Sequence, residues 1–520
     1  MPVEAAEKSS SRGERFLHSV LWTWSGVAVS VFTGFFLARF IVHRVGHDAA
    51  GVWALIFSVL EGVWMMDLGF RAAVLKYTAH YRALAQPEKV NETINTGLAF
   101  SGFGCAVAIT VALLFARSIT RFENVSVEYA EVFTKLLIMV GIVWAFGALF
   151  NLLSATIEAY QRFDLTSRIW IVQLALRAFG IVAVLATGHG LLAMGEVALS
   201  SMAISYALTF LALRRVFPDF RISPRLVSYE MFRRMLGYGL HTFGATAGTQ
   251  TLTQGAPILI GHFSAAPAFV AYFTYPQRLF LYSGDMVGRV GLISSSHTAE
   301  LAARDDYSSI AQMGIFINRY CFTLFAPFTI AVLIYGRQIF GLWIDPKFAA
   351  ECAAVLPVMA LGITLATVAQ YNSSSILYGL GKHHGYAYSM MVEAVLFLAG
   401  LWWAIPRYGI LGAAWVSSGL LVLNRGIVLS ILICHALRYN FWRYFGGIYA
   451  RPILASIPVL LVAAWIKSHW IPGATWLQLI GTSAIIAGMY FAIAYFLCLD
   501  PRHRSMPVNF VKARLRRAAA

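Results

Sequence analysis

The sequence has little charge and little cysteine. Aspartate, glutamate, lysine and arginine make up 12% of its 520 residues, whereas soluble domains carry about a quarter. This composition excludes an ordinary soluble domain. The five cysteines have no close pairs, which excludes a disulfide scaffold and argues against a zinc site. No glycine-rich phosphate loop occurs, so we expect no ATP-driven step in this chain.

Long apolar runs take up most of the chain instead. Hydrophobic residues make up 59% of the sequence, and the mean hydropathy is +0.68. Each run has about 20 to 28 residues, which as a helix crosses a hydrocarbon layer roughly 30 Å thick. We predict an all-α polytopic membrane protein with about 14 transmembrane helices, at residues 17–42, 49–70, 93–117, 132–157, 167–187, 189–213, 235–261, 268–293, 313–336, 352–379, 386–405, 409–434, 449–470 and 475–498.

The formal net charge is +16, and its distribution along the chain bears on topology. Loops that share a side of the membrane with the two termini hold most of the lysines and arginines. By the positive-inside rule, both termini then lie in the cytoplasm. The basic excess favours contact with anionic membrane lipid and does not predict a nucleic-acid partner.

The chain divides into two halves that resemble each other. Three segments of the first half recur about 220 residues later, with an even number of spans between them, so the repeats point the same way. "DLGFR" matches "DMVGR", "NLLSATIEAYQRF" matches "NSSSILYGLGKHH", and "HGLLAMGEVALSS" matches "YGILGAAWVSSGL". We predict an N-lobe at 1–213 (helices 1–6), a cytoplasmic linker at 214–234, a C-lobe at 235–437 (helices 7–12), helices 13 and 14 at 438–498, and a basic cytoplasmic tail at 499–520.

Three motifs and the twelve-plus-two helices resemble a known family. The motifs are "DLGF" in the second run, "EAYQRF" closing the fourth and "YGLGKHHGYAY" after the tenth. They resemble the Wzx-type polysaccharide flippases, the polysaccharide transporters of the multidrug/oligosaccharidyl-lipid/polysaccharide (MOP) superfamily. The resemblance covers nearly the whole chain.

The resemblance implies two six-helix bundles around a central cavity in the bacterial inner membrane. It implies movement of a polyprenyl-pyrophosphate-linked oligosaccharide by alternating access, for O-antigen or exopolysaccharide biosynthesis, without enzymatic chemistry. It implies no bound cofactor, although relatives in the superfamily draw on H⁺ or Na⁺ gradients. Polysaccharide polymerases or assembly proteins would be its protein partners.

Two acid–base pairs stand at matching places in the second span of each lobe. Asp67 precedes Arg71 by four residues, and Asp285 precedes Arg289 by four, so each pair shares a helical face near the cytoplasmic end. One interpretation is a structural ion pair, because such residues are common near the membrane surface. The other is a cytoplasmic gate whose carboxylates exchange partners as the lobes move.

Four further charges fall near the middle of their spans, where a charge costs about 2.5–3.5 kcal/mol to insert. The N-lobe carries Glu61 and Arg177, and the matching spans of the C-lobe carry Arg278 and Glu393. One interpretation is an ion pair within each lobe. In the other, Arg177 and Arg278 line a cationic cavity, because arginine binds a pyrophosphate through paired hydrogen bonds. Glu61 and Glu393 are then candidates for ion coupling.

Amide side chains in the apolar runs are candidates to bind the sugars of the cargo. They are Gln250, in the polar run "TAGTQTLTQG", and Asn318, Gln370 and Asn372 in the second half. The alternative is that they bond neighbouring helices. Lipid II flippases of the same superfamily carry arginines in their first, second and eighth spans, and Arg39, Arg71 and Arg278 stand in those spans here.

Two other functions fit parts of the sequence. A cation-coupled drug exporter of the same superfamily usually has twelve helices, so the two extra helices and the internal arginines favour an anionic cargo. A membrane glycosyltransferase or polymerase usually carries a large outer loop with catalytic residues, and the outer loops here are short. We therefore expect a flippase and not an enzyme.

Overall fold

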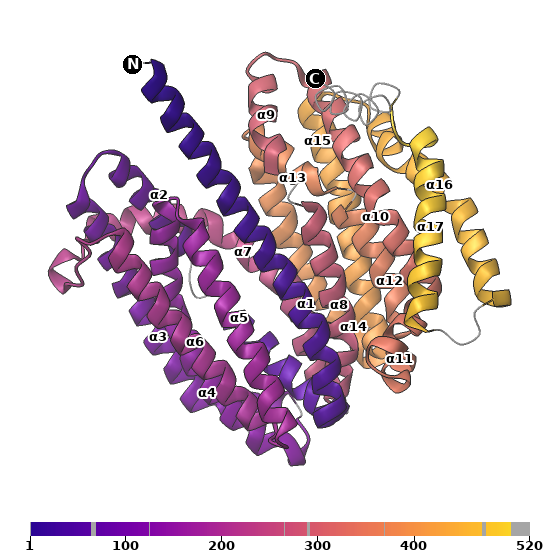
Figure 1. Cartoon of the computed structure of the whole chain (residues 1–520), viewed down its shortest axis with the longest axis horizontal. Coiled ribbons are helices and arrows are strands. Elements are labelled where there is room, and N and C mark those ends of the chain that lie inside the picture. The colour runs from indigo at the N-terminus through magenta and orange to yellow at the C-terminus, as the bar shows by residue number, and fades with distance from the viewer. Residues whose placement is uncertain are drawn as a thin grey trace. The chain divides into compact units, whose positions relative to one another are not determined.

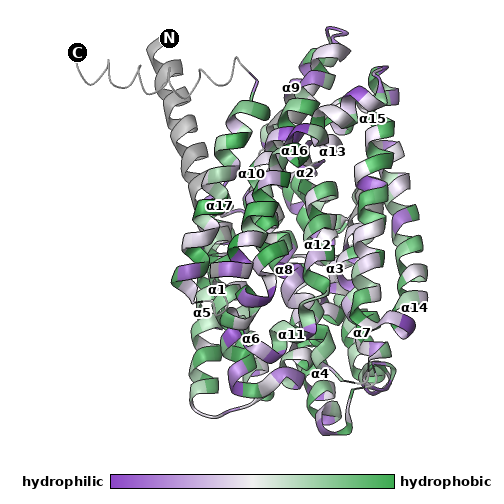
Figure 2. Cartoon of the chain, turned by 90° about the vertical axis from the view of Figure 1, so that its right-hand side faces the viewer, coloured by the Kyte–Doolittle hydropathy of each residue, from purple (hydrophilic) through white to green (hydrophobic). Residues whose placement is uncertain are grey.

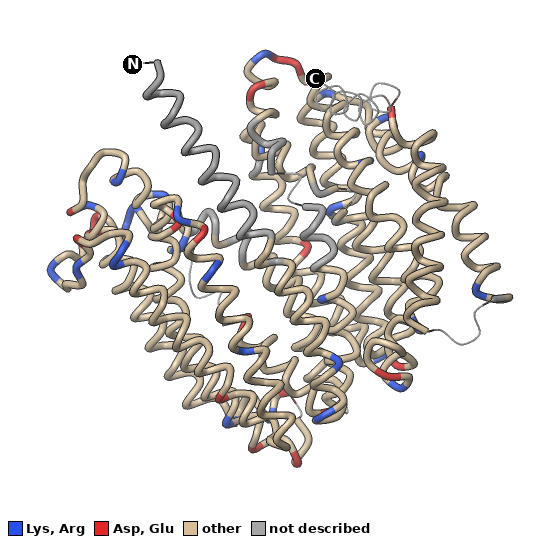
Figure 3. Tube along the Cα trace, in the orientation of Figure 1, with Lys and Arg blue, Asp and Glu red and all other residues tan. Residues whose placement is uncertain are grey.

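The computed structural model describes residues 2–63, 69–123, 125–264, 266–288, 292–368, 370–470 and 475–500. Throughout these residues the regular structure is helical, and no strand occurs (Figure 1). Hydrophobic residues extend along the helices (Figure 2), whereas most charged residues lie near helix ends and in turns (Figure 3). The predicted all-α class is confirmed.

Nine helices in the described part of the chain are long and apolar enough to cross a membrane. Pro346–Cys352 and Val355–Ala366 are bent by 60° relative to each other, and taken together they are long and apolar enough to count as a tenth. One of the nine, His384–Leu437, contains two of the apolar runs. This arrangement is that of a multi-pass membrane protein, in rough agreement with the predicted count of about 14 helices.

In each of two long helices, a glycine lies between two of the predicted apolar runs. Gly46 has a φ of 86° within α1 (Pro2–Val63), and Gly409 has a φ of 57° within α14 (His383–Leu421). Glycine adopts positive φ without the steric cost that a side chain incurs. Because each glycine lies at the junction of two predicted spans, each marks the turn between them.

Contacts between residues group the chain into two units, Met1–Ala271 (unit 1) and Tyr272–Ala520 (unit 2). Unit 1 contains α1, α2 (Phe70–Ala83), α3 (Pro87–Phe122), α4 (Val127–Ala159), α5 (Phe163–Ala186), α6 (Leu191–Val216), the short 3₁₀ helix η2 (Pro224–Leu226) and α7 (Tyr229–Phe263). Its core includes Phe70 of α2, Leu152 of α4, Phe220 of the linker and Met235 of α7. The predicted lobe boundaries at residues 213 and 235 stay a prediction.

The linker that follows α6 is held on α3 by two asparagines one helical turn apart. Asn91 Nδ2 donates to the carbonyl of Asp219 (3.0 Å), and Asn91 Oδ1 accepts from the backbone amide of Arg221 (2.9 Å). Asn95 repeats this pattern on the carbonyl of Arg221 and the amide of Ser223, both at 2.8 Å. The two side chains thus bind alternate residues of an extended segment, so residues 219–223 form an ordered part of unit 1.

Unit 2 contains most of α8 (Ala268–Gly288), followed by α9 (Leu292–Ala302), α10 (Tyr307–Trp343), α11 (Pro346–Cys352), α12 (Val355–Gly362), η3 (Ile363–Val368), α13 (Tyr371–Gly379), α14, η4 (Val422–Val428), α15 (Leu429–Leu437), α16 (Phe441–Trp470) and α17 (Trp476–Leu497). Its core includes Tyr335 of α10, Ile376 of α13, Tyr444 of α16 and Tyr490 of α17. The two C-terminal helices therefore share one core with the rest of unit 2.

Two segments of unit 2 wind as π-helices and pack against each other. They are η3 and η4. At η3, Thr364 lies 2.6 Å from Thr329 of α10, hydroxyl to hydroxyl. π-turns are rare and are frequently found at functional sites. This pair of segments therefore directs attention to the polar residues around them.

Candidate transport site

The carboxyl group of Glu61 lies against α7. Its Oε2 accepts a hydrogen bond from Gln254 Nε2, and its backbone carbonyl accepts one from Gln250 Nε2 at 3.1 Å. Gln250 and Gln254 are one turn apart, so both amides reach the last turn of α1. The polarity of the "TAGTQTLTQG" run is thus explained in part by contacts between α1 and α7. Sequence reasoning selected Gln250 and missed Gln254, although the four-residue spacing places both on one face.

Arg71 is bound by two residues of α4. Its Nε donates to Asn151 Oδ1 at 2.9 Å, and its Nη2 lies 2.7 Å from Glu158 Oε2. Both partners belong to the "NLLSATIEAYQRF" segment, so this motif holds α2 to α4 through one guanidinium. The signal for Glu158 was available, because it is the only acidic residue of that segment.

The predicted Asp/Arg pairs lie partly outside the described residues. Asp67 and Arg289 are outside them altogether, and the side chain of Asp285 is outside them as well. The pairing of Asp67 with Arg71, and of Asp285 with Arg289, therefore stays a prediction. Arg71 itself is placed by α4, as described above.

Three of the predicted sugar-binding amides come together in unit 2. Asn318 Nδ2 donates to Ser373 Oγ at 3.0 Å, and Asn318 Oδ1 accepts from the backbone amide of Asn372 at 3.1 Å. Gln370 Nε2 donates to Tyr449 Oη at 3.0 Å, and Gln370 Oε1 accepts from Ser373 Oγ at 2.5 Å. These side chains are at most 5% exposed. The network bonds α10 and α16 to the segment at the start of α13.

Glu393 of α14 lies in the interior of unit 2. It is 3% exposed, and its Oε2 accepts a hydrogen bond from Asn424 Nδ2 at 2.6 Å. Asn424 belongs to the π-helical segment η4, which links the acid to one of the two π-turns. Within the described residues, the other oxygen of Glu393 has no hydrogen-bond partner.

The three arginines predicted to contact phosphate lie on different helices. Arg278 of α8 is exposed, and it makes no ion pair with the described residues. The ion pair between Arg278 and Glu393, one of the two interpretations of the mid-span charges, is therefore not formed in this structure. Arg39 of α1 is exposed, and Arg177 of α5 is half-buried. The pairing of Arg177 with Glu61 stays a prediction.

The chain matches known proteins in sequence and in fold, although no family model matches it. A Shigella flexneri protein provisionally described as an O-antigen transporter is 19% identical over 396 residues, which are 76% of this chain and 92% of that protein. The lipid II flippase MurJ, in an inward closed conformation, superposes with a TM-score of 0.70 at 12% identity, covering 92% of this chain and 98% of MurJ. An inward-facing multidrug resistance MATE transporter gives a TM-score of 0.65 at 12% identity, covering 79% of this chain and 95% of that chain.

The chain has the same fold as MurJ and this MATE transporter of the MOP superfamily. This confirms the resemblance to the superfamily that the motifs and the helix count predicted. The match to the O-antigen transporter covers nearly all of that protein, so the similarity is not confined to one half of the chain.

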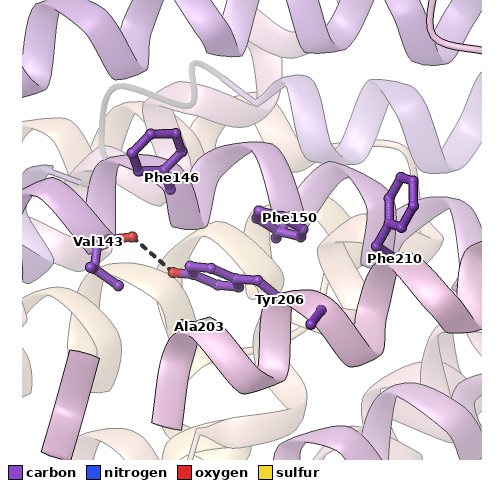
Figure 4. A pocket seen from close by; sticks show the side chains of 7 residues that line it. Val143, Phe146, Phe150, Ala203, Tyr206 and Phe210 are labelled. Atoms are coloured by element: carbon purple, nitrogen blue, oxygen red, sulfur yellow. Dashed lines mark hydrogen bonds between the residues drawn. The ribbon is translucent and has the colours of Figure 1, made fainter. Parts of the chain in front are cut away.

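An apolar cavity lies between α4 and α6 of unit 1. It has a volume of about 450 Å³ and is lined by Val143, Phe146, Phe150, Ala203, Tyr206, Ala207 and Phe210. Tyr206 stacks on Phe150 with ring centroids 4.4 Å apart, and its hydroxyl donates to the Val143 carbonyl at 2.9 Å (Figure 4). The one polar side chain in the lining is thus already bonded, so this cavity offers no partner for a phosphate group.

Proposed function

We propose that this protein moves a lipid-linked oligosaccharide across the bacterial inner membrane by alternating access. The observation that carries the proposal is the match along 92% of the Shigella flexneri protein, in a chain whose fold is that of MurJ and the MATE transporters. The cargo would be a polyprenyl-pyrophosphate-linked saccharide that serves surface polysaccharide biosynthesis. The protein would act as a transporter and not as an enzyme.

Arginines would bind the pyrophosphate of this cargo. Arg278 supports this role best, because it is exposed on α8 and makes no ion pair with the described residues. A guanidinium bonds phosphate oxygens through two parallel N–H groups, which a lysine ammonium cannot do. Arg177 and Arg39 would supply the remaining positive charge.

Amide side chains would have a smaller part in binding the sugars. The side chains of Gln250, Asn318 and Gln370 are engaged in contacts between helices, and Asn372 donates its backbone amide to Asn318. A buried amide gives up a hydrogen bond before it can bind a ligand, and the net cost is about 1–3 kcal/mol for each group left without a partner. These residues would contact cargo only in a state in which their helices have moved.

Acidic residues would respond to that movement. Arg71 would keep its bonds to Asn151 and Glu158 while Asp67 forms or breaks a third contact, and the Asp285–Arg289 pair would form and break in the same way in unit 2. Glu61 and Glu393 are the candidates to take up a coupling H⁺ or Na⁺. Anionic membrane lipid would contact the basic linker and tail, with both termini in the cytoplasm.

A drug exporter of the same superfamily is the second candidate. The match to the MATE transporter covers 79% of this chain, whereas the match to MurJ covers 92%. More of the chain therefore superposes on the lipid II flippase than on the drug transporter. The helices α16 and α17 belong to the core of unit 2, which also fits a fold of fourteen helices better than one of twelve. These observations favour the flippase.

Deletion of the gene and localisation of the lipid-linked saccharide test the proposal. We expect the saccharide to accumulate in the cytoplasmic leaflet, where an impermeant glycan-oxidising reagent cannot reach it in right-side-out vesicles. Complementation with the wild-type gene is the control. Greater drug sensitivity with normal saccharide distribution would support the exporter and contradict the flippase.

A further inference from the structure

Glu123 is an acidic side chain in an apolar environment at one end of unit 1. It is the residue that follows α3, in the turn before α4, and its backbone amide bonds to the Ile119 carbonyl at 2.9 Å. The residue is only 3% exposed. Its Oε2 has no hydrogen-bond partner among the described residues. A carboxylate without a partner is costly to bury, so this position favours the neutral acid.

The space for this carboxyl group depends on a glycine of α7. A Cβ atom at Gly261 would lie 2.6 Å from Glu123 Oε2 and 2.7 Å from Leu55 Cδ1. The carboxyl end thus fills the gap between Leu55 of α1 and the backbone of α7. Next to it, His262 stacks on Phe122 with ring centroids 4.1 Å apart and contacts the Phe122 carbonyl. The ends of α3 and α7 therefore meet Leu55 of α1 at this carboxyl.

Other titratable groups on the surrounding helices are occupied elsewhere or exposed. On α1, Asp48 accepts from the backbone amide of Ala268 at 3.3 Å, and on α7, His262 contacts Phe122. Arg121 of α3 and Glu128 of α4 are exposed. Burial raises the pKa of Glu123 from 4.5 to about 8. The folded protein therefore holds this proton at neutral pH, whereas an exposed glutamate does not.

We propose that Glu123 is a proton-binding site, at which a carboxylate takes up one H⁺ when the ends of α3 and α7 close around it against Leu55 of α1, and releases it when they open. The proposal deepens the proposed transport function, on which its use as a coupling site rests. The turn between α3 and α4 is on the side that the charge distribution assigns to the exterior, so protons would arrive from outside. An inward proton gradient would then favour the closed arrangement of this end.

Infrared spectroscopy of the full-length protein in lipid nanodiscs tests the site directly. The probe is the C=O stretching band of a protonated carboxylic acid, followed against pH. We expect a band in the wild type that disappears with a midpoint near pH 8, and that is absent from Glu123→Gln. Glu128→Gln, which removes an exposed acid nearby, should leave it unchanged. A band that is identical in wild type and Glu123→Gln at every pH would overturn the proposal.

A second variant tests the site independently, in case Glu123→Gln does not fold. Gly261→Ala places a methyl group where the carboxyl end lies, and the flexible side chain should move outward into water. We expect its titration midpoint to shift from near 8 towards the ordinary value of 4.5. An unchanged midpoint in a folded Gly261→Ala protein would contradict the geometry on which the site rests.

The outcome is separable from the cargo assignment. The infrared titration needs no substrate, so it can succeed even if deletion of the gene leaves the lipid-linked saccharide in place. Conversely, a failed titration leaves the saccharide experiment intact. Coupling itself is measured by polysaccharide output in cells, which we expect to depend on external pH in the wild type and not in Glu123→Gln. Identical pH dependence in both would rule out coupling through this residue.

Discussion

Arg278 and Glu393, two charged residues in apolar helices of unit 2, differ in their exposure and in their bonding partners. Arg278 is exposed and makes no ion pair with described residues, whereas Glu393 is 3% exposed and bonded to Asn424. The sequence located both near the middle of a span. It did not distinguish them, because burial and pairing depend on which helices pack together. The difference matters, since an exposed guanidinium can meet a phosphate and a buried acid needs a partner of its own.

Replacement of Arg278 tests its role as a phosphate contact. Because a hydrogen bond to a charged group contributes about 1.5–3 kcal/mol, Arg278→Ala should weaken cargo binding roughly 10- to 100-fold and abolish most export. Arg177→Ala should act in the same direction. The measurement is surface polysaccharide in the deletion strain at matched membrane expression.

Arg304→Ala is the control for these variants, because Arg304 is an exposed arginine that pairs with Glu300, four residues earlier, at 2.6 Å. It should support normal export. Normal polysaccharide from both Arg278→Ala and Arg177→Ala would reject the cationic site.

At the scale of helices, the apolar runs predicted a multi-pass helical protein, and the structure adds that Gly46 and Gly409 lie at two of the turns between them. Contacts between helices were harder to foresee. Glu158 and Asn424 were missed as partners of Arg71 and Glu393, because they lie about 90 and 30 residues away in sequence. Glu123 was missed for another reason: the pattern places it in a polar loop, and only the meeting of α1, α3 and α7 buries it.

The contact between α3 and the linker gives a prediction at this scale. Asn95→Ala removes the hydrogen bonds to Arg221 and Ser223, so we expect about 1–3 kcal/mol of lost stability and faster tryptic cleavage at Arg221 and Arg225. Limited proteolysis of the protein in nanodiscs measures it.

Thr110→Ala is the matched control on the same helix, because the Thr110 hydroxyl donates to the Ala106 carbonyl within that helix. It should be cleaved at the wild-type rate. Equal cleavage of Asn95→Ala and wild type would show that the linker is not held in this way.

At the scale of the molecule, we predicted from the sequence that the last two helices stand outside a repeat of twelve helices. In the structure, Tyr444 of α16 and Tyr490 of α17 are fully buried in the core of unit 2. Beyond α17, Asp500 lies 2.7 Å from Arg319 of α10 and 3.1 Å from Arg451 of α16. The repeat analysis could not predict this, because a helix outside the repeat has no counterpart from which its packing partners can be inferred.

Truncation tests this integration. A chain ending at Leu437 should fail to fold, because it exposes apolar core surface of α10 and α13, at a cost of about 25 cal/mol per Å². A chain ending at Asp500 keeps both helices and the contacts to Arg319 and Arg451, so it should remain monodisperse. Size-exclusion chromatography of fluorescent fusions compares them. A monodisperse chain ending at Leu437 would show that unit 2 is complete without α16 and α17.

The asparagine pair on α3 also constrains where the chain can be altered. Asn91 and Asn95 together engage Asp219, Arg221 and Ser223, so the spacing of the linker must match the rise of one helical turn. A single residue inserted in this stretch would shift the linker, so that an asparagine Nδ2 group would face a backbone N–H group in place of a carbonyl. Epitope tags and reporter fusions therefore belong elsewhere, for instance in the exposed turn at Asp305, where φ is already positive and no such alignment is interrupted.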